Sequence, residues 1–223
     1  PRDRAEPALL DLVPRDRRRI YDARKLLRLV LDRDTLFELG RGHGRPQITA
    51  LARLGGQPVG VWANDPRFYA GAMTAAAARK VRRFVELCDS FHLPVVAFVD
   101  EPGFMIGSRA EQEATIRFGA EAIFAVVQAT VPWASVIVRK SYGVAAAAHF
   151  APEATVFAWP SAEGGALRSQ DLRTTGDPVS LDGSIIRVDP ATGAGLPDNP
   201  LAASTDPNAA SSAWVIRGVD DFV

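Results

Sequence analysis

The residues best placed for chemistry lie in two turns, each of which follows a buried-strand pattern and precedes a helical pattern. The first turn spans residues 99–107 (VDEPGFMIG) and the second spans residues 139–146 (RKSYGVAA). A helix start leaves backbone N–H groups unpaired and carries positive potential, so an oxyanion can be stabilised there. Gly103 and Gly143 would let a ligand approach the backbone closely, although they equally suit tight turns that bind nothing.

Side chains that commonly carry catalysis are few and scattered. His43, His92 and His149 have neither a histidine nor a cysteine at metal-ligand spacing, so we expect structural roles for them and no metal site. The one cysteine, Cys88, lies in the apolar helical pattern of residues 84–91, which predicts a core thiol rather than a nucleophile. A single cysteine allows no disulfide within the chain, which favours a cytoplasmic protein.

Four charged residues stand beside the turns. Asp100 and Glu101 could be taken for an acid/base pair, but neighbouring residues on a strand point to opposite faces of a sheet. Arg139 and Lys140 could bind a phosphate or a carboxylate. Between that reading and a solvated strand end, we favour the solvated strand end.

The surrounding sequence alternates strand and helix patterns. Short runs rich in β-branched and aromatic residues indicate strands, and apolar residues at spacings of three and four indicate helices. The expected helices cover residues 20–31, 71–91, 108–130 and 143–150, and the expected strands cover residues 48–53, 58–64, 93–100, 134–138 and 155–159. Gly55-Gly56 predicts a hairpin between the first two strands, and Ser108 is the expected N-cap of the third helix.

This order of elements predicts an α/β fold in which helices pack on a largely parallel sheet. A strand–turn–strand–helix unit followed by strand–helix suits a crotonase-type spiral better than a doubly wound sheet, although periodicity alone does not separate the two. The fold should occupy residues 20–167. The basic lead, residues 1–19, is expected to be solvated and partly disordered.

After residue 167 the composition changes. Residues 168–212 are rich in Asp, Gly, Pro, Ser, Thr and Asn, a composition typical of loops. One short strand is expected at residues 184–188, between two turn signals. We therefore expect a loop-rich tail, residues 168–223, outside the α/β domain.

The bulk composition argues against several classes of protein. The 223 residues are 47% hydrophobic, which is enough for a packed core, and 26 basic residues balance 26 acidic ones. This balance gives no indication of a nucleic-acid partner, and the absence of a window of about 18 apolar residues predicts no membrane span. The start lacks the apolar run of a secretory signal, and because the first residue is Pro1 we expect a fragment of a longer protein.

Five stretches of the sequence resemble the C-terminal domain of the carboxyltransferases in biotin-dependent acyl-CoA carboxylases. The likeness covers residues 20–167 in order and in register, although no single stretch is specific by itself. The stretches are YDARKLL (21–27), GQPVGVWANDP (56–66), ARKVRRFVELCDSFHLPVVAFVDEPGFMIG (78–107), IRFGAEAIFAVVQATVPWASVIVRKSYG (116–143) and FAWPSAEGGA (157–166).

The resemblance implies a crotonase-like fold and transfer of a carboxyl group from carboxybiotin to the α-carbon of an acyl-CoA. It implies no metal, biotin delivered by a carboxyl carrier protein, a biotin carboxylase subunit as partner, and a homo-oligomer. In this family the acyl-CoA binds to an N-terminal domain, so the chain alone should be weakly active or inactive. The sequence does not separate a carboxylase from a related decarboxylase.

The resemblance also implies which residues form the site. In the family, the two backbone amides that follow an RKxYG motif hold the oxyanion on biotin, and here these belong to Val144 and Ala145. Further positions that match the surroundings of the biotin and acyl pockets are Gly103, Phe104, Tyr142, Gly143 and Ala147. Many relatives have Gly-Gly-Ala or Gly-Leu-Gly where this chain has Gly143-Val144-Ala145. A backbone N–H survives any side chain except proline, so the oxyanion hole can persist if Val144 keeps a negative φ.

Residues 182–209 (DGSIIRVDPATGAGLPDNPLAASTDPNA) resemble a segment of the glucose/sorbosone dehydrogenases that use pyrroloquinoline quinone (PQQ) and fold as β-propellers. The segment is too short to form a propeller, so we expect no quinone or calcium site and consider a chimeric origin for residues 168–223. Two alternatives to an active carboxyltransferase stay open. One is a non-catalytic fragment or assembly module of such a complex, and the other is a fragment of a PQQ-dependent sugar dehydrogenase.

Overall fold

The computed structural model describes residues 6–14, 16, 19–159, 162–164, 185–186 and 215–216. The chain divides into two compact units, residues 1–162 and 163–223. The second unit contains the short strands β7 (Glu163–Gly164), β8 (Ile185–Ile186) and β9 (Val215–Ile216), and β8 pairs with β9 in antiparallel orientation. β8 falls within the strand predicted at residues 184–188. The rest of the predicted tail, including most of the dehydrogenase-like segment, lies outside the described residues.

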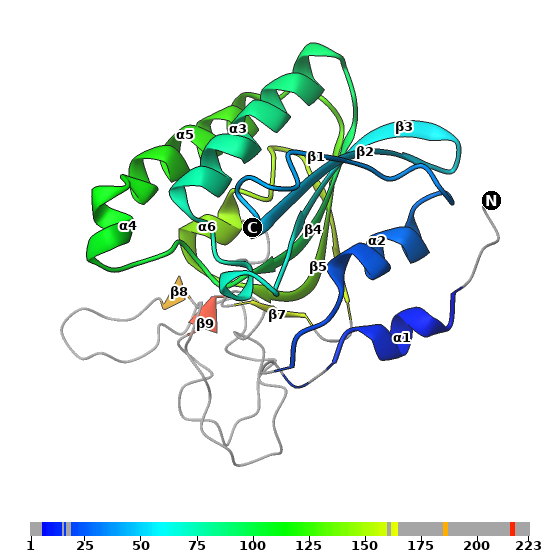
Figure 1. Ribbon diagram of the computed structural model, residues 1–223, viewed down its shortest axis with the longest axis horizontal. Helices are drawn as coiled ribbons and strands as arrows, with labels where there is room; N and C mark the ends of the chain where they lie inside the picture. The colour runs from blue at the N-terminus through cyan, green and yellow to red at the C-terminus, as the bar shows by residue number, and fades with distance from the viewer. Residues whose placement is uncertain are drawn as a thin grey trace. The chain divides into compact units, whose positions relative to one another are not determined.

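One sheet runs through the first unit in the order of the chain, β1-β2-β3-β4-β5-β6 (Figure 1). Its strands are β1 (Phe37–Leu39), β2 (Gln47–Leu54), β3 (Gln57–Asn64), β4 (Val95–Glu101), β5 (Trp133–Ser141) and β6 (Thr155–Ala158). The strands from β1 to β3 pair antiparallel, and the strands from β3 to β6 pair parallel. The predicted hairpin and the predicted parallel region are therefore confirmed, whereas the edge strand β1 was not predicted.

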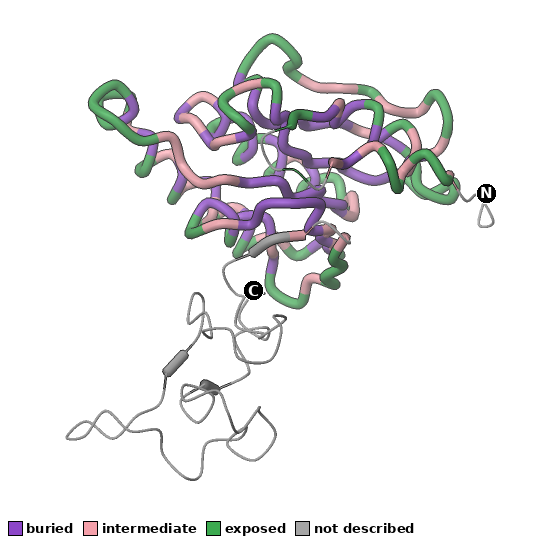
Figure 2. The backbone as a smooth tube through the Cα atoms, turned by 90° about the horizontal axis from the view of Figure 1, so that it is seen from below, coloured by how far each residue is buried: buried purple, intermediate pink, exposed green. Residues whose placement is uncertain are grey.

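Helices cover both faces of this sheet. One face carries α3 (Ala75–Ser90), α5 (Thr115–Gln128) and the short α6 (Gly143–Ala147), and the other carries α2 (Ala23–Val30) (Figure 1). Alternate residues of β4 separate the two cores, because Val95 and Ala97 pack under α3 and α5 whereas Val96 and Phe98 pack under α2. Burial is accordingly concentrated along the sheet (Figure 2). None of the described helices has the length and apolar character that a membrane span requires.

Small residues let α3 pack closely on the sheet. Thr74 caps the helix by accepting a hydrogen bond from the Ala77 amide at 3.2 Å. On β3, a Cβ added to Gly60 would lie 2.4 Å from Cys88 Sγ, so only glycine fits beneath the helix at that point. Cys88 is fully buried, which confirms the predicted core thiol, and burial raises its pKa to about 12.

A buried ion pair fixes α2 to the opposite face. The Arg24 guanidinium donates to both oxygens of Glu38 on β1, at 2.8 and 2.6 Å, and also to Asp65 after β3. Paired hydrogen bonds of this kind set orientation as well as distance. The short helix α1 (Ala8–Leu12) precedes α2, within the lead where no element was predicted.

The single helix predicted over residues 108–130 is wrong. The structure has α4 (Ser108–Gln112) and α5, separated by Ala114 in a left-handed conformation (φ 58°), and the residue before α4 is Gly107 rather than the predicted N-cap Ser108. The buried stripe of α5 consists of Thr115, Gly119, Ala122 and Val126. A continuous helix would have extended that stripe to residues 111 and 112, which are polar, whereas the break lets Ala110 be buried instead.

Candidate functional site

The adjacent parallel strands β4 and β5 bring the two predicted turns together at one edge of the sheet. Glu101 at the end of β4 is in register with Ser141 at the end of β5, and the carbonyl oxygen of Glu101 accepts a hydrogen bond from the Tyr142 amide at 3.0 Å. The predicted residues of the first turn are Gly103 and Phe104, and those of the second are Tyr142, Gly143, Val144, Ala145 and Ala147. The structure therefore places both groups on segments that leave the sheet side by side.

The second turn opens α6 and leaves two amides available. Val144 and Ala145 are the second and third residues of the helix, whose own bonding pattern gives their N–H groups no acceptor. Among the described residues, no acceptor outside the helix takes their place. Val144 has no positive φ, and its side chain is 67% exposed, whereas the Ala145 side chain is buried in the core. The Val144 side chain thus points to solvent, and the backbone N–H of Val144 can still donate a hydrogen bond.

Open space adjoins the backbone of both turns. Gly103 and Gly143 have φ values of 128° and 62°, in the left-handed region that favours glycine. A Cβ built on either glycine would meet no atom within 4 Å, so neither turn is closed by a neighbouring side chain of the described chain. A ligand group can approach the main chain at both positions.

Phe104 packs on α5 rather than standing free beside the turn. An added Cβ on Gly119 of α5 would lie 2.3 Å from Cε1 of the Phe104 ring, so the ring rests directly on the glycine. The turn is further fixed by Met73, whose amide donates to the Gly103 carbonyl at 3.0 Å and whose carbonyl accepts from the Met105 amide at 2.9 Å. The ring and the two backbone bonds hold the first turn against the body of the domain.

Glu101 is the residue that joins the two turns. Its side chain is fully buried, and Oε1 accepts a hydrogen bond from the Gly103 amide at 3.0 Å. Oε2 accepts from Gln47 Nε2 and Asn64 Nδ2, each at 3.0 Å. Because its backbone carbonyl also holds Tyr142, one buried residue positions both segments. A buried carboxylate with several donors is stabilised in place, since leaving it unpaired would be costly.

His149, just past α6, has a structural environment. Its ring stacks on Trp62 with a centroid distance of 3.8 Å, and Nε2 lies 3.4 Å from Glu101 Oε2. Nδ1 has no hydrogen-bond partner among the described residues. The ring is fully buried, so it packs the base of α6 rather than facing the open space at the turns.

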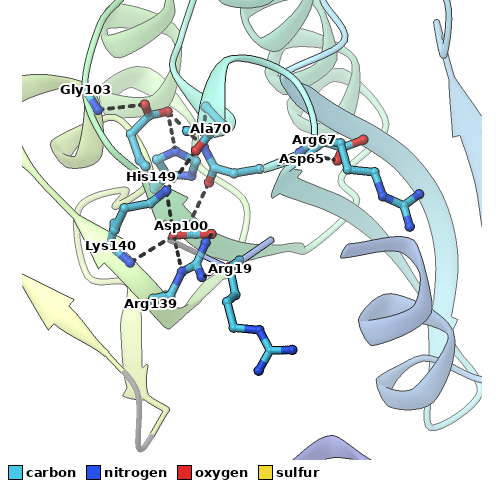
Figure 3. A network of polar contacts seen from close by, with 12 residues as sticks. Arg19, Asp65, Arg67, Ala70, Asp100, Gly103, Arg139, Lys140 and His149 are labelled. Atoms are coloured by element: carbon cyan, nitrogen blue, oxygen red, sulfur yellow. Dashed lines mark hydrogen bonds and ion pairs between the residues drawn. The ribbon is translucent and has the colours of Figure 1, made fainter. Parts of the chain in front are cut away.

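The solvated strand end predicted for Arg139 and Lys140 is wrong, because both side chains are buried at 1% and 7% exposure. Asp100 is the reason: its carboxylate accepts from Arg139 Nη2 at 3.0 Å and lies 3.4 Å from Lys140 Nζ (Figure 3). Arg139 also lies over the Tyr21 ring at 5.1 Å. One carboxylate thus pairs with both cations within the fold, so the basic pair is bound to the protein's own Asp100 instead of forming a solvated strand end.

Burial shapes the acid–base properties of this cluster. It lowers the pKa of Lys140, an effect that the Asp100 carboxylate opposes. Burial and the same carboxylate together raise the pKa of Tyr21 well above its ordinary value. Asp100 and Glu101 engage different partners, as expected of neighbouring strand residues, and they do not act as an acid/base pair. Among the described residues, no group of three or more His, Cys, Asp or Glu side chains is arranged to hold a metal ion.

Comparison with known proteins identifies the family of the chain. The family model described as the carboxyl transferase domain matches residues 1–173. The chain belongs to the carboxyl transferase domain family. The chain is 44% identical over 138 residues to the uncharacterized carboxylase YngE of Bacillus subtilis (strain 168), covering 62% of this chain and 27% of the relative.

Two further matches concern a transcarboxylase. The methylmalonyl-CoA carboxyltransferase 12S subunit of Propionibacterium freudenreichii subsp. shermanii is 39% identical over 158 residues, which are 70% of this chain and 30% of the relative. A crystal structure of transcarboxylase 12S, described as a hexamer assembly with hydrolyzed methylmalonyl-coenzyme A bound, superposes with a TM-score of 0.68 at 38% identity, covering 72% of this chain and 32% of that one. The chain thus spans about a third of the length of these relatives.

These matches confirm the predicted carboxyltransferase resemblance and the crotonase-like α/β fold. The family match begins at residue 1, so it includes the lead that the predicted domain left out, and it ends at residue 173. It lends no support to the likeness of residues 182–209 to quinone-dependent dehydrogenases.

Sequence reasoning missed the residues that hold the site together. Glu101 was considered only as a catalytic acid, and Gln47 and Asn64 were not singled out. The available signal was a polar residue at the end of each of three strand patterns, but which ends meet depends on the strand order, which periodicity does not give.

Proposed function

We propose that this chain is the carboxybiotin-facing part of a biotin-dependent acyl-CoA carboxyltransferase, in which the Val144 and Ala145 amides stabilise negative charge during carboxyl transfer. The observation that carries the proposal is the pair of amides at the start of α6 that have no acceptor among the described residues, beside backbone that is open at Gly103 and Gly143. Family membership supports the same chemistry, and the transcarboxylase relative is named as a carboxyltransferase.

The residues present fit a biotin ring carried on a partner protein. Two parallel N–H donors suit one carbonyl-type oxygen, and the lack of a neighbouring side chain at Gly143 leaves room for a flat ring system. Biotin would supply the transferable carboxyl group when bound. The amides of Val144 and Ala145 would then donate to the oxygen on which negative charge develops, and Glu101 holds the nearby Gly103 and Tyr142 amides in place beforehand.

Other proposed roles follow from the same arrangement. Gly103 and Phe104 would form one wall of the pocket, and Tyr142 and Gly143 the other. Ala147 is a small, exposed residue on α6, which would leave space for an extended acyl chain of the acyl-CoA. We also propose that a biotin carboxyl carrier and a biotin carboxylase act with this protein in the cytoplasm. A homo-oligomer is proposed as well, because the similar transcarboxylase 12S forms a hexamer assembly.

A proline substitution tests the central amide, because proline is the one residue without a backbone N–H. We expect biotin methyl ester to shift the amide NMR signals of residues 143–145. Val144→Pro should weaken its binding about fivefold, the usual value of one neutral hydrogen bond, while Val144→Ala should leave it unchanged. Thermal unfolding of both variants confirms that the fold is kept.

The variants Val144→Pro and Val144→Ala also separate an effect on catalysis from an effect on binding, when each is measured in an enzyme assembled with its acyl-CoA-binding part. Val144→Pro should lower kcat by about 100- to 1000-fold, as loss of an oxyanion donor does elsewhere, with little change in KM for the acyl-CoA. Equal activity of Val144→Pro and Val144→Ala would leave only the assembly-module alternative. Shifts confined to residues far from the two turns would contradict the assignment of the site.

A further inference from the structure

Two adjoining cavities lie away from the two turns, and one of them is between α3 and the β1–β2 edge of the sheet. One cavity, of about 420 Å³, has a largely apolar wall formed by Leu39, Phe84 and Leu87, and we call it the apolar cavity. Its volume falls within the range of small-molecule sites. It shares no residue with the turns at Gly103 and Gly143, so its occupant would be distinct from the proposed carboxyl-transfer chemistry.

The mouth of the apolar cavity is cationic. Arg79, Lys80 and Arg83 of α3 contribute to its lining, and none of the described lining residues is acidic. A neighbouring cavity of about 840 Å³ shares His43 and Arg79 with it. This basic cavity is lined by four arginines, Arg45, Arg67, Arg79 and Arg109, and by the single acid Glu113. Arg109 pairs with Glu113 and Arg67 pairs with Asp22, so the excess charge is that of Arg45 and Arg79. The chain as a whole has equal numbers of acidic and basic residues, so this local excess of positive charge is a feature of the surface and not of the composition.

The two arginines that line the apolar cavity, Arg79 and Arg83, differ from Arg82 on the same helix. Arg82 is bound to the carboxylates of Glu86 and Glu121, each at 2.8 Å. Arg79 and Arg83 are exposed, and within the described part of the chain neither has a carboxylate partner, although the Arg79 guanidinium lies over the Phe118 ring at 4.5 Å. Residues four apart share one side of a helix, so the two guanidinium groups project from the same side of α3, beside the cavity. They are therefore available to an anionic head group.

Lys80 does not compete for that role. Its Nζ donates to the backbone carbonyls of Gln47 at 2.8 Å and His43 at 3.1 Å, which holds the amine in the wall. Burial also lowers its pKa to about 8, so part of the population is neutral near physiological pH. The charge that faces a ligand is that of the arginines.

We propose that the apolar cavity binds the hydrocarbon chain of a single-headed amphipathic anion, whose carboxylate or phosphate head is held by Arg79 and Arg83. The hydrocarbon would contact Phe84 and Leu87 and be removed from water, while the planar guanidinium groups match either oxyanion. A ligand that has only the hydrocarbon chain, or only the anionic head, would contact only half of the site.

Calorimetric titration of the full chain tests this proposal. The probes are decanoate, decyl phosphate, decanol and inorganic phosphate, each below its micelle-forming concentration. We expect saturable binding of at least one of the two amphipathic anions, with a Kd on the order of 100 µM, and much weaker binding of decanol and inorganic phosphate. The comparison of decanoate with decyl phosphate assigns the head group.

Matched variants locate the site. The double substitution Arg79→Ala/Arg83→Ala should weaken the anion at least about tenfold, and Leu87→Gln should weaken the anion and decanol alike. Arg82→Ala is the control, since it removes a cation from the same helix outside the cavity, and it should have no effect. The proposal is overturned if neither anion binds saturably, if decanol binds as tightly as the anions, or if Arg82→Ala weakens binding as much as the double variant. None of these measurements depends on carboxyl transfer.

Discussion

Replacing Gly119 with alanine sets two opposing effects against each other at the first turn. Alanine in a helix interior is more favourable than glycine by about 1 kcal/mol. The new Cβ, however, would lie 2.3 Å from Cε1 and 2.4 Å from Cζ of Phe104, well inside van der Waals contact. Moving the ring out of a packed position costs about 1–3 kcal/mol, so we expect a net loss of about 1 kcal/mol in the free energy of unfolding.

A double-mutant cycle isolates the contact between the ring and the helix. In a Phe104→Ala background no ring opposes the new methyl group, so Gly119→Ala should stabilise the protein by about 1 kcal/mol. The difference between the two backgrounds, about 2 kcal/mol, is the coupling energy that the structure predicts. Urea unfolding followed by tryptophan fluorescence measures all four species. Ala120→Gly, at an exposed position on the same helix, gives the propensity contribution separately.

The decisive result is whether Gly119→Ala raises or lowers the free energy of unfolding when the Phe104 ring is present. If Gly119→Ala stabilised the protein equally with and without the Phe104 ring, the ring would not rest on α5. The first turn would then lack the side-chain contact that we describe, and only the Met73 and Glu101 hydrogen bonds would position Gly103.

Three further outcomes follow from buried groups. Cys88, with its pKa raised to about 12 by burial, should not react with a thiol reagent at pH 8 unless the protein unfolds, and labelling of the folded chain within minutes would contradict this. Asp100→Ala should cost about 3–5 kcal/mol in urea unfolding, because it leaves Arg139 buried without its counter-charge, and a loss below about 1 kcal/mol would show that water reaches the cluster. The pKa of Lys80 is about 8 in the folded protein and 10.5 ordinarily, so the unfolded chain holds the proton more tightly between these values and Lys80 adds stability as the pH rises through them. The free energy of unfolding of wild type relative to Lys80→Met should therefore increase from pH 8 to pH 10, and parallel pH profiles would refute the low pKa.

Sequence patterns predicted well the elements that a local run of residues is enough to identify. β4 is buried along its whole length, and its run of apolar residues could be recognised without knowledge of its neighbours. The hairpin of β2 and β3 was equally easy to predict, because Gly55 and Gly56 lie between two strand patterns. The two turns of the candidate site were found for the same reason, since each lies between a buried strand and a helix.

What the sequence did not reveal depends on partners far along the chain. Arg139 and Lys140 read as a solvated strand end because their counter-charge, Asp100, is about 40 residues away and meets them only when β4 pairs with β5. The break at Ala114 carries no glycine or proline to mark it, and it follows from which residues can be buried against the sheet. Glu101 escaped notice as a joining residue because its donors come from separate strands and turns.

The sheet adds its strands in the same order as the chain delivers them, from β1 to β6. From β2 to β6, each strand therefore pairs with the strand that precedes it in the chain, and none of them has to be inserted between two earlier strands. A protein with this layout can assemble progressively from its amino end while the ribosome is still at work, with little unpaired edge exposed at any stage. The two turns of the candidate site, which depend on β4 and β5, would take shape before β6 is added.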